Sequence, residues 1–276
     1  MATIGFLTPY KHLPNFCKFI KGKFKDLNLR KINRDEIKIF KGIDYLFAAP
    51  NYLNYILEEK DIEGMNLKGI ISPSTGINHI NIKSKPIYSI KNDPILKDIT
   101  STAEHNLFLI LSLIRNSNKI EELSTKTLGI LGYGRLGKML HNISKNIFKD
   151  IKISDDSFTD NDFFEKTDIL SININLEDRN INYIDKKYIN KFKKNILIVN
   201  TARGEVVDED AILDNITEGK VLGYGTDVIK EEYTPKATNL KITSDPRIIR
   251  TPHIGGIAIS AQEKAYKRVI EKLYQV

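Results

Sequence analysis

The stretch that decides the fold is Leu128-Gly129-Ile130-Leu131-Gly132-Tyr133-Gly134-Arg135-Leu136-Gly137. Its last six residues have the pattern G-x-G-x-x-G, directly after an apolar run and at the start of a helix-like segment. Gly132 permits a tight turn, Gly134 lets the backbone approach a pyrophosphate, and Gly137 lets the helix pack close to the sheet. The first N–H groups of the helix, near Arg135 and Leu136, favour a negatively charged ligand. The segment predicts a dinucleotide-binding unit.

A carboxylate follows the next predicted strand, as such a site requires. Asp155 comes at the end of Ile151–Ser154, 18 residues after Gly137, where it can accept hydrogen bonds from both hydroxyls of a ribose. No arginine follows it directly, and Asp156 adds negative charge that would repel a 2′-phosphate. We therefore expect NAD rather than NADP. The alternative is a surface aspartate beside an ordinary glycine turn.

Apolar runs alternate with helix-like stretches along most of the chain, which is typical of parallel sheets wrapped by helices. The predicted strands are Thr3–Leu7, Tyr45–Ala48, Gly69–Ser72, Ile87–Ser89, Thr127–Leu131, Ile151–Ser154, Ile169–Ile174, Ile196–Asn200, Gly223–Asp227 and Ile248–Arg250. Between the strands predicted within residues 3–89 and those predicted within residues 127–250, Ser101 and Glu104 have capping-box spacing, with Ser101 at the N-cap of a long helix. A second amphipathic helix is predicted over Ser260–Tyr274.

Composition and charge narrow the class of protein. The 276 residues, 41% of them hydrophobic, exceed one average domain. The net charge of +7 comes from scattered lysines, so we expect no nucleic-acid partner. No apolar run reaches the length of a membrane span, and the N-terminus lacks the features of a signal peptide. Cys17 is the only cysteine, so we expect no disulfide and no metal site. These features favour a cytoplasmic protein.

Three polar segments follow predicted strands in the second half of the chain: Asn200–Asp208 (NTARGEVVD), Gly223–Glu232 (GYGTDVIKEE) and Thr251–Gly256 (TPHIGG). Their side chains should gather at the carboxyl edge of one sheet, where open α/β sheets bind ligands. Together they supply a guanidinium, a carboxylate and an imidazole, which suit a 2-keto acid. Arginine can hold its carboxylate or carbonyl, histidine can protonate the carbonyl oxygen, and the carboxylate can stabilise the imidazolium.

These motifs, in this order, resemble those of the D-isomer-specific 2-hydroxyacid dehydrogenase family, which includes phosphoglycerate dehydrogenases and glyoxylate/hydroxypyruvate reductases. The resemblance runs from about Ser72 to Gly256. It implies a catalytic set of Arg203, Glu232 and His253, with Arg203 and His253 also contacting the substrate. It further implies that Asp227, Thr201 and Gly256 belong to the cofactor site. The loop residues that would hold the substrate carboxylate through backbone amides are Ser74, Thr75 and Gly76.

The resemblance also implies an architecture of two doubly wound parallel-sheet α/β domains. A flavodoxin-like substrate-binding domain, residues 1–100 and 258–276, would be interrupted by an inserted Rossmann NAD-binding domain, residues 101–257. Substrate would bind in the cleft between them, and the chain would form a homodimer. The expected reaction is hydride transfer between nicotinamide and C2 of a small D-2-hydroxy acid or 2-keto acid.

The sequence departs from the family pattern at five positions without losing a catalytic group. Asn78 and Asn81 stand where acids are common, and Asn173 and Asn175 replace a frequent histidine and proline. The last two border the adenine region, so they are expected to affect cofactor affinity. Tyr233 stands where proline usually follows the catalytic glutamate.

Other interpretations remain open at this stage. Arg203 could be a surface residue in a turn, Glu231 could replace Glu232, and His253 could be structural. At the level of function, the alternatives are a non-catalytic, NAD-sensing corepressor-like protein and a formate-dehydrogenase-like enzyme. In the formate branch an amide replaces the acid beside the histidine, so Glu232 argues against it. The identity of the 2-hydroxy acid is not indicated.

Overall fold

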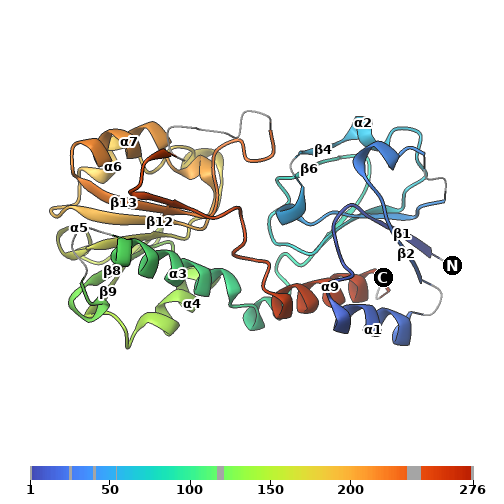
Figure 1. Ribbon diagram of the computed structural model, residues 1–276, viewed down its shortest axis with the longest axis horizontal. Helices are drawn as coiled ribbons and strands as arrows, with labels where there is room; N and C mark the ends of the chain where they lie inside the picture. Colours follow the sequence, from blue (N-terminus) through green and yellow to red (C-terminus); the bar gives the residue numbers. More distant parts are fainter. Residues whose placement is uncertain are drawn as a thin grey trace. The chain divides into compact units, whose positions relative to one another are not determined.

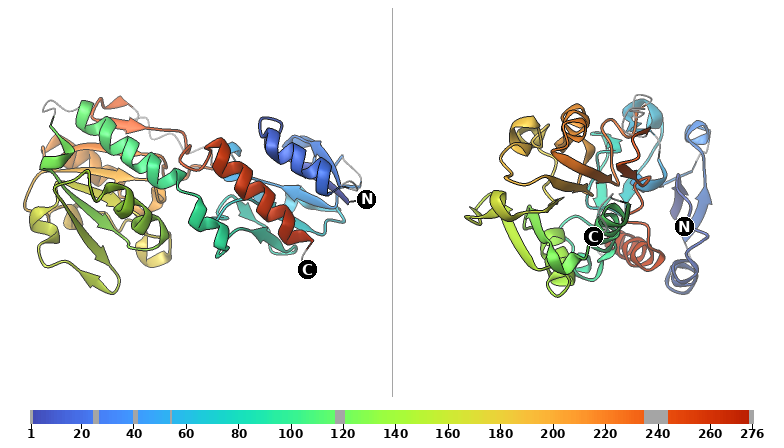
Figure 2. Two further views of the ribbon diagram at one scale, coloured as in Figure 1. Left: turned by 90° about the horizontal axis from the view of Figure 1, so that it is seen from below. Right: turned by 60° about the vertical axis from the view of Figure 1, so that its left-hand side comes forward.

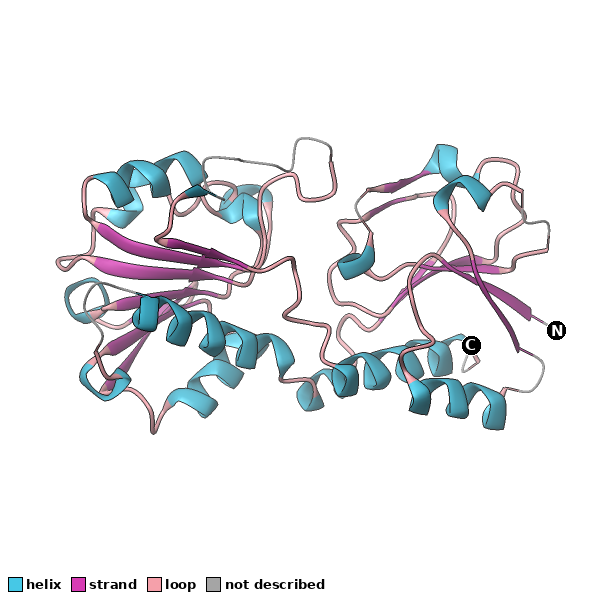
Figure 3. Ribbon diagram, viewed as in Figure 1, coloured by secondary structure: helices cyan, strands magenta, loops and turns pink. Residues whose placement is uncertain are grey.

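The computed structural model of the protein describes residues 2–24, 27–39, 42–53, 55–116, 121–234 and 244–274. The chain divides into two compact units, one formed by Met1–Ile99 with Gly256–Val276 and the other by Thr100–Gly255. Each unit is built on a mainly parallel sheet with helices packed on it (Figures 1 and 3). The predicted fold class, two doubly wound α/β domains, is therefore confirmed.

The first unit has a five-stranded parallel sheet in the order β2-β1-β3-β5-β7. Its strands are β1 (Ala2–Phe6), β2 (Leu27–Lys31), β3 (Tyr45–Phe47), β5 (Gly69–Ser72) and β7 (Ile87–Ser89). A separate pair is formed by β4 (Leu57–Glu58) and β6 (Ile80–Asn81). The order reverses between β1 and β3, as in flavodoxin-like sheets. The edge strand β2 was not predicted, because its sequence LNLRK mixes polar and apolar residues.

The helices of the first unit come from both ends of the chain: α1 (Pro14–Lys23), α2 (Glu59–Ile62) and α9 (Ile259–Leu273). Figure 2 shows α9 beside α1, and it also packs against β5 and β7. Tyr266 of α9 lies edge-on to Phe16 of α1, with 5.5 Å between ring centroids. Nε of Arg268 donates to both carboxylate oxygens of buried Asp93, at 3.0 and 2.9 Å. These contacts make the C-terminal helix part of this unit's core.

The second unit has a seven-stranded sheet in the order β10-β9-β8-β11-β12-β13-β14. Its strands are β8 (Thr127–Leu131), β9 (Asp150–Asp155), β10 (Phe158–Thr159), β11 (Ile169–Ile172), β12 (Ile196–Asn200), β13 (Val221–Thr226) and β14 (Ile248–Arg250). All pairs are parallel except β9 with the two-residue β10. The order reverses between β8 and β11, which places the glycine turn after β8 at the switch point of the sheet.

The helices of the second unit are α3 (Ser101–Asn116), α4 (Arg135–Ser144), α5 (Phe163–Lys166), α6 (Lys186–Ile189) and α7 (Glu209–Thr217). One predicted cap is wrong. Ser101 lies inside the first turn of α3, and its hydroxyl donates to the carbonyl of Gly255 at 2.5 Å. Thr100 precedes the helix, and its hydroxyl donates to Glu104 at 2.5 Å. A tertiary contact has therefore replaced the predicted local one.

Five strands, β5, β7, β8, β12 and β14, have the predicted bounds. The strand β11 ends two residues earlier than predicted, at Ile172, and the N–H of Asn173 still donates to the carbonyl of Leu131 at 2.7 Å.

Among the described helices, none combines the length and the apolar character needed to cross a bilayer.

Candidate active site

The glycine turn after β8 has the shape that a pyrophosphate requires. Gly132 has φ +90°, and a Cβ there would lie 2.8 Å from the carbonyl carbon and oxygen of Asn173. A Cβ on Gly137 would lie 2.1 Å from the carbonyl oxygen of Gly132, so only glycine lets α4 approach this closely. Gly134, the N-cap residue of α4, would meet nothing within 4 Å. The turn therefore exposes backbone at a helix N-terminus, and its residues fit a dinucleotide.

Asp155 is the last residue of β9, as predicted, and an arginine from a distant segment lies close to the acid that follows it. Nη2 of Arg179 donates to Asp156 at 2.7 Å, and its Nε donates to Glu177 at 2.9 Å. Arg179 follows β11 and lies 23 residues further along the chain than Asp156. The carboxylate of Asp156 is thus paired with a cation that the sequence did not indicate, and because Arg179 is shared by Asp156 and Glu177 the three side chains together keep a negative charge. All three side chains are exposed.

A buried chain of hydrogen bonds connects the ends of β11 and β12 to α3. Nδ2 of Asn173 donates to the hydroxyl of Ser171 at 2.9 Å, and this hydroxyl donates to Oδ1 of Asn106 at 3.1 Å. Nδ2 of Asn106 in turn donates to the hydroxyl of Thr201 at 2.9 Å. Ser171 and Asn106 are fully buried. Two residues predicted to border the cofactor, Asn173 and Thr201, are therefore held in place by hydrogen bonds to the buried side chains of Ser171 and Asn106.

Thr201, Asp227 and Thr251 each come directly after a strand, and the strands are in register. Asn200 of β12 pairs with Thr226 of β13, which pairs with Arg250 of β14. The N–H of Asp227 donates to the carbonyl of Asn200 at 3.0 Å, and that of Thr251 donates to Thr226 at 2.9 Å. The three polar segments thus start side by side at the carboxyl edge of the sheet.

His253 and Glu232 are in direct contact. Nδ1 of His253 lies 2.8 Å from Oε1 and 2.9 Å from Oε2 of Glu232. An ionised carboxylate can only accept, so Nδ1 carries a proton and the neutral ring keeps its lone pair on Nε2. The backbone of His253 has φ 54°, in the left-handed region that residues other than glycine rarely adopt. The surrounding contacts must hold it there, which is common at functional sites.

Asp227 provides those contacts. Its Oδ1 accepts the hydroxyl of Thr251 at 2.6 Å and the N–H of Ile254 at 2.8 Å, and its Oδ2 accepts the N–H of Gly255 at 2.8 Å. Nε2 of His105 lies 3.3 Å from Oδ1. Burial raises the pKa of this carboxyl, but the hydrogen bonds from His105, Thr251 and the two amides outweigh it, and the pKa lies below its ordinary value. Asp227 thus binds the loop on both sides of His253.

The segment after Arg203 packs directly on the segment that carries Glu232. A Cβ on Gly204 would lie 1.9 Å from the carbonyl carbon of Ile229, so the two backbones touch at this glycine. The N–H of Lys230 donates to Oε1 of buried Glu209 at 3.1 Å. The arginine and glutamate segments are therefore fixed to one another.

The side chain of Arg203 is half-buried, and its Nη1 donates to the carbonyl of Ala202 at 2.7 Å. Tyr233 lies close to the His253–Glu232 pair and is influenced by the charge of Arg203. Burial raises the pKa of the Tyr233 phenol far above its ordinary value, the charge of Glu232 raises it further, and the positive charge of Arg203 opposes both. The phenol oxygen also lies 3.4 Å from Nδ1 of His253. Tyr233, which the sequence marked only as a departure, thus lies against the His253–Glu232 pair, and the charge of Arg203 acts on its phenol.

The predicted substrate loop lies in the first unit, directly after β5, and a chain of hydroxyls braces it. The hydroxyl of Ser74 donates to the carbonyl of Gly76 at 2.7 Å, so it accepts from the hydroxyl of Ser72 at 2.8 Å. Ser72 must then accept from Nε2 of His79, at 3.2 Å. That nitrogen lies equally close to the carbonyl of Ala48, which can only accept. Buried His79 therefore carries a proton on Nε2 and supports the loop. Thr75 is exposed.

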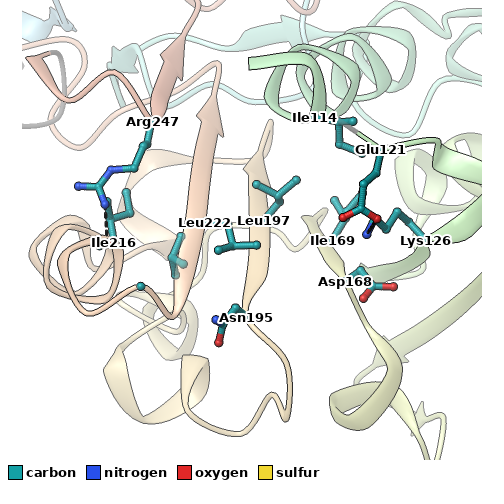
Figure 4. Close-up of a pocket in the computed structure, with 12 residues that line it drawn as sticks. Ile114, Glu121, Lys126, Asp168, Ile169, Asn195, Leu197, Ile216, Leu222 and Arg247 are labelled. Carbon is teal, nitrogen blue, oxygen red and sulfur yellow. Dashed lines mark hydrogen bonds and ion pairs between the residues drawn. The ribbon is translucent and has the colours of Figure 1, made fainter. Parts of the chain in front are cut away.

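A pocket of about 460 Å³ in the second unit lies away from these residues. Figure 4 shows aliphatic side chains from the first residues of β11, β12 and β13, with charged side chains around them. Ile169, Leu197 and Val221 lie at the amino ends of their strands, whereas the polar segments follow the carboxyl ends. The pocket is therefore at the opposite edge of the sheet from the candidate active site.

A glycine turn at the switch point of the sheet, a carboxylate at the end of the next strand and a histidine–glutamate pair after the later strands are the features of a nucleotide-dependent oxidoreductase. Residues 112–255 match the family described as D-isomer specific 2-hydroxyacid dehydrogenase, NAD binding domain. The protein belongs to this family, and NAD is its cofactor.

The known proteins to which this chain is similar are named for different activities. The chain is 29% identical over 259 residues to the mitochondrial formate dehydrogenase of Solanum tuberosum, covering 82% of this chain and 68% of the relative. It is 31% identical over 248 residues to the glyoxylate reductase of Thermofilum pendens, covering 76% and 72%. Among solved structures, the NAD⁺-bound 3-phosphoglycerate dehydrogenase of Entamoeba histolytica has a TM-score of 0.79 at 23% identity, covering 99% and 94%. That likeness shows the fold.

Proposed function

We propose that this NAD-dependent oxidoreductase transfers a hydride between nicotinamide and C2 of a small D-2-hydroxy acid or 2-keto acid. The observation that carries the proposal is the contact of His253 with Glu232, in which Nδ1 faces both carboxylate oxygens at 2.8 and 2.9 Å. This geometry commits the Nδ1 proton to the carboxylate and leaves Nε2 to exchange a proton with a substrate oxygen.

In the direction of reduction, the protonated Nε2 of His253 donates its proton to the carbonyl oxygen at C2 as hydride reaches the carbon. The product is a 2-hydroxy acid, and the ring is left neutral. In the reverse direction Nε2 takes the hydroxyl proton back. Glu232 stabilises the imidazolium and keeps the proton of the neutral ring on Nδ1.

Arg203 and the substrate loop are the proposed carboxylate-binding groups. A guanidinium can donate two parallel hydrogen bonds to a carboxylate or keto acid, and Arg203 is fixed to the Glu232 segment through Gly204. The backbone amides of Ser74, Thr75 and Gly76 are proposed to bind the same carboxylate. The braced hydroxyl chain from His79 supports this role, because it holds the loop in one conformation.

The dinucleotide, when bound, supplies or accepts the hydride at its nicotinamide ring. The residues proposed to hold it are Gly132, Gly134, Arg135, Leu136, Gly137, Asp155, Thr201, Asp227 and Gly256. The open backbone at Gly134 and the start of α4 at Arg135 support the phosphate position. Asp227 is proposed to reach the nicotinamide through Oδ2, because three of its four partners lie at Oδ1.

Formate oxidation is the competing activity, since a formate dehydrogenase is among the relatives. Formate gives up a hydride to form carbon dioxide, and no oxygen has to gain or lose a proton at an imidazole. The Glu232–His253 contact would then have no chemical task. A keto acid is therefore favoured over formate as the substrate.

The test is a screen of NADH oxidation with glyoxylate, hydroxypyruvate, pyruvate, longer 2-keto acids and phosphohydroxypyruvate, with NAD⁺ reduction by formate run in parallel. We expect turnover of at least one keto acid and none of formate. Turnover of formate alone would replace the proposal with the competing activity. Binding of NADH without turnover of any substrate would favour a corepressor-like sensor.

We also propose that the protein is a homodimer. Exposed apolar side chains on α3 support this, with Phe108 51% and Leu111 39% exposed, because apolar patches on a surface often mark contacts between chains. Light scattering coupled to gel filtration would measure the molar mass, and a monomer at micromolar concentration would contradict the proposal.

A further inference from the structure

Tyr233 lies against the histidine–glutamate pair, although it follows Glu232 at a position where the family pattern has proline. Its phenol oxygen is 3.4 Å from Nδ1 of His253, and the two rings are tilted by 41° with centroids 6.5 Å apart. A proline at this position has no group that could reach the imidazole.

The direction of the contact follows from the proton count. Nδ1 faces two carboxylate oxygens of Glu232, which only accept, so the single proton on Nδ1 points toward acceptors. Nδ1 then has no lone pair for the phenol hydrogen. The Tyr233 oxygen can interact with Nδ1 only as an additional acceptor, longer and weaker than the two carboxylate contacts.

Charges of both signs act on the phenol, and the negative groups outnumber the positive one. Glu232, Glu205 and Asp227 contribute negative charge, and Arg203 contributes positive charge. Burial is the largest effect and raises the pKa of the phenol far above its ordinary value. The phenol is therefore neutral at neutral pH, and it acts on the imidazole through its dipole and its position.

We propose that Tyr233 is a positioning residue of the catalytic site, in which the phenol oxygen supports the imidazolium form of His253 as a third acceptor at Nδ1. The proposal rests on the proposed function for its kinetic consequences. An acceptor at Nδ1 stabilises the positively charged ring more than the neutral ring, because the charged donor forms the stronger hydrogen bond. Tyr233 therefore extends to higher pH the range in which His253 can donate a proton.

The kinetic test compares Tyr233→Phe with the wild-type enzyme in keto acid reduction across pH. This variant keeps the ring and removes only the oxygen. We expect kcat to fall about threefold at alkaline pH, which is the change in rate that corresponds to a displacement of the pH profile by about half a unit. The alkaline limb of the pH profile should move to lower pH by about half a unit, with little change in KM for NADH. Tyr183→Phe, at an exposed tyrosine of the same unit, should leave kcat and the profile unchanged.

A second measurement does not depend on turnover. The proton on Nδ1 of His253 should give a low-field NMR signal, assigned by its loss in His253→Ala, and this signal should shift in Tyr233→Phe but not in Tyr183→Phe. An unshifted signal together with an unchanged pH profile would overturn the role of Tyr233. If no keto acid were turned over, the proposed function would fail, and the NMR signal would still decide whether the phenol contacts the imidazole.

Discussion

Oδ2 of Asp227 accepts the N–H of Gly255 at 2.8 Å, two residues beyond His253. The same carboxylate accepts from Thr251, two residues before it. One buried side chain therefore fixes both ends of the short loop that holds the catalytic candidate in a left-handed conformation. The stability of this loop depends on the ionised form of Asp227.

Asp227→Asn should destabilise the protein by about 1–3 kcal/mol at neutral pH, because an amide cannot accept from both backbone N–H groups and the hydroxyl. The folded pKa of Asp227 lies below the ordinary value of 3.8. Its contribution is therefore fully present above that pH and is lost as pH falls through the folded pKa. Denaturant unfolding should show a difference between wild type and variant that shrinks below about pH 4. A difference independent of pH would show that the charge is unimportant.

His253→Ala should lower keto acid turnover by about 10²-fold or more, since general acid catalysis supplies roughly 10²–10⁴. Calorimetry should give a nearly unchanged Kd for NADH, because His253 is separate from the glycine turn. Glu232→Gln should keep the fold and lose much of the rate. Wild-type turnover in His253→Ala would remove the imidazole from the mechanism.

Gly204→Ala should reduce kcat and cost about 1–3 kcal/mol of stability, as overpacking does. A Cβ at this position would lie 1.9–2.3 Å from backbone atoms of Ile229 and Lys230, so the Glu232 segment has to move. Gly22→Ala is the matched control, because a Cβ there meets nothing within 4 Å and the residue lies within α1. Thermal unfolding and steady-state kinetics measure both effects. Equal behaviour of the two variants would contradict the tight contact.

Asp155→Ala should narrow the preference for NADH over NADPH by roughly tenfold or more, because two ribose hydroxyls lose a charged acceptor. Arg179 stays paired with Asp156 and Glu177 beside this site, and its positive charge can favour a 2′-phosphate more strongly once the opposing charge of Asp155 is removed. Adding Arg179→Ala to the first variant should reverse part of the NADPH gain. The ratio of kcat/KM for the two cofactors is the measurement, and an unchanged ratio in Asp155→Ala would show that the ribose is bound elsewhere.

His79→Ala should raise KM for the keto acid several-fold without changing Kd for NADH, because the lost Nε2–H donor leaves the hydroxyl chain to Gly76 unsupported. His79→Asn should restore part of the affinity, since its amide can donate. Equal KM values in the wild type and His79→Ala would show that the loop does not depend on this chain. A stability measurement on each variant separates loop disorder from unfolding.

The sequence by itself determined the features that depend on residues close together in the sequence. Apolar runs bounded by turn residues predicted β5, β7, β8, β12 and β14 with their bounds, and the three glycines after β8 predicted the turn. The resemblance to the dehydrogenase family selected Glu232 rather than Glu231, and the structure places Glu232 against His253. The strand and turn predictions succeed because a glycine's conformation, or the periodicity of a strand, is a local property.

Tertiary structure alone decided which distant side chains meet. The contacts of Asp227 with the 251–255 loop, of Arg179 with Asp156, of His79 with Ser72 and of Tyr233 with His253 all join residues on separate segments. Ser101 shows the same effect, because its hydroxyl contacts Gly255 instead of capping its own helix. Such contacts depend on how strands align and loops pack, and many sequences with the same local pattern would form different ones.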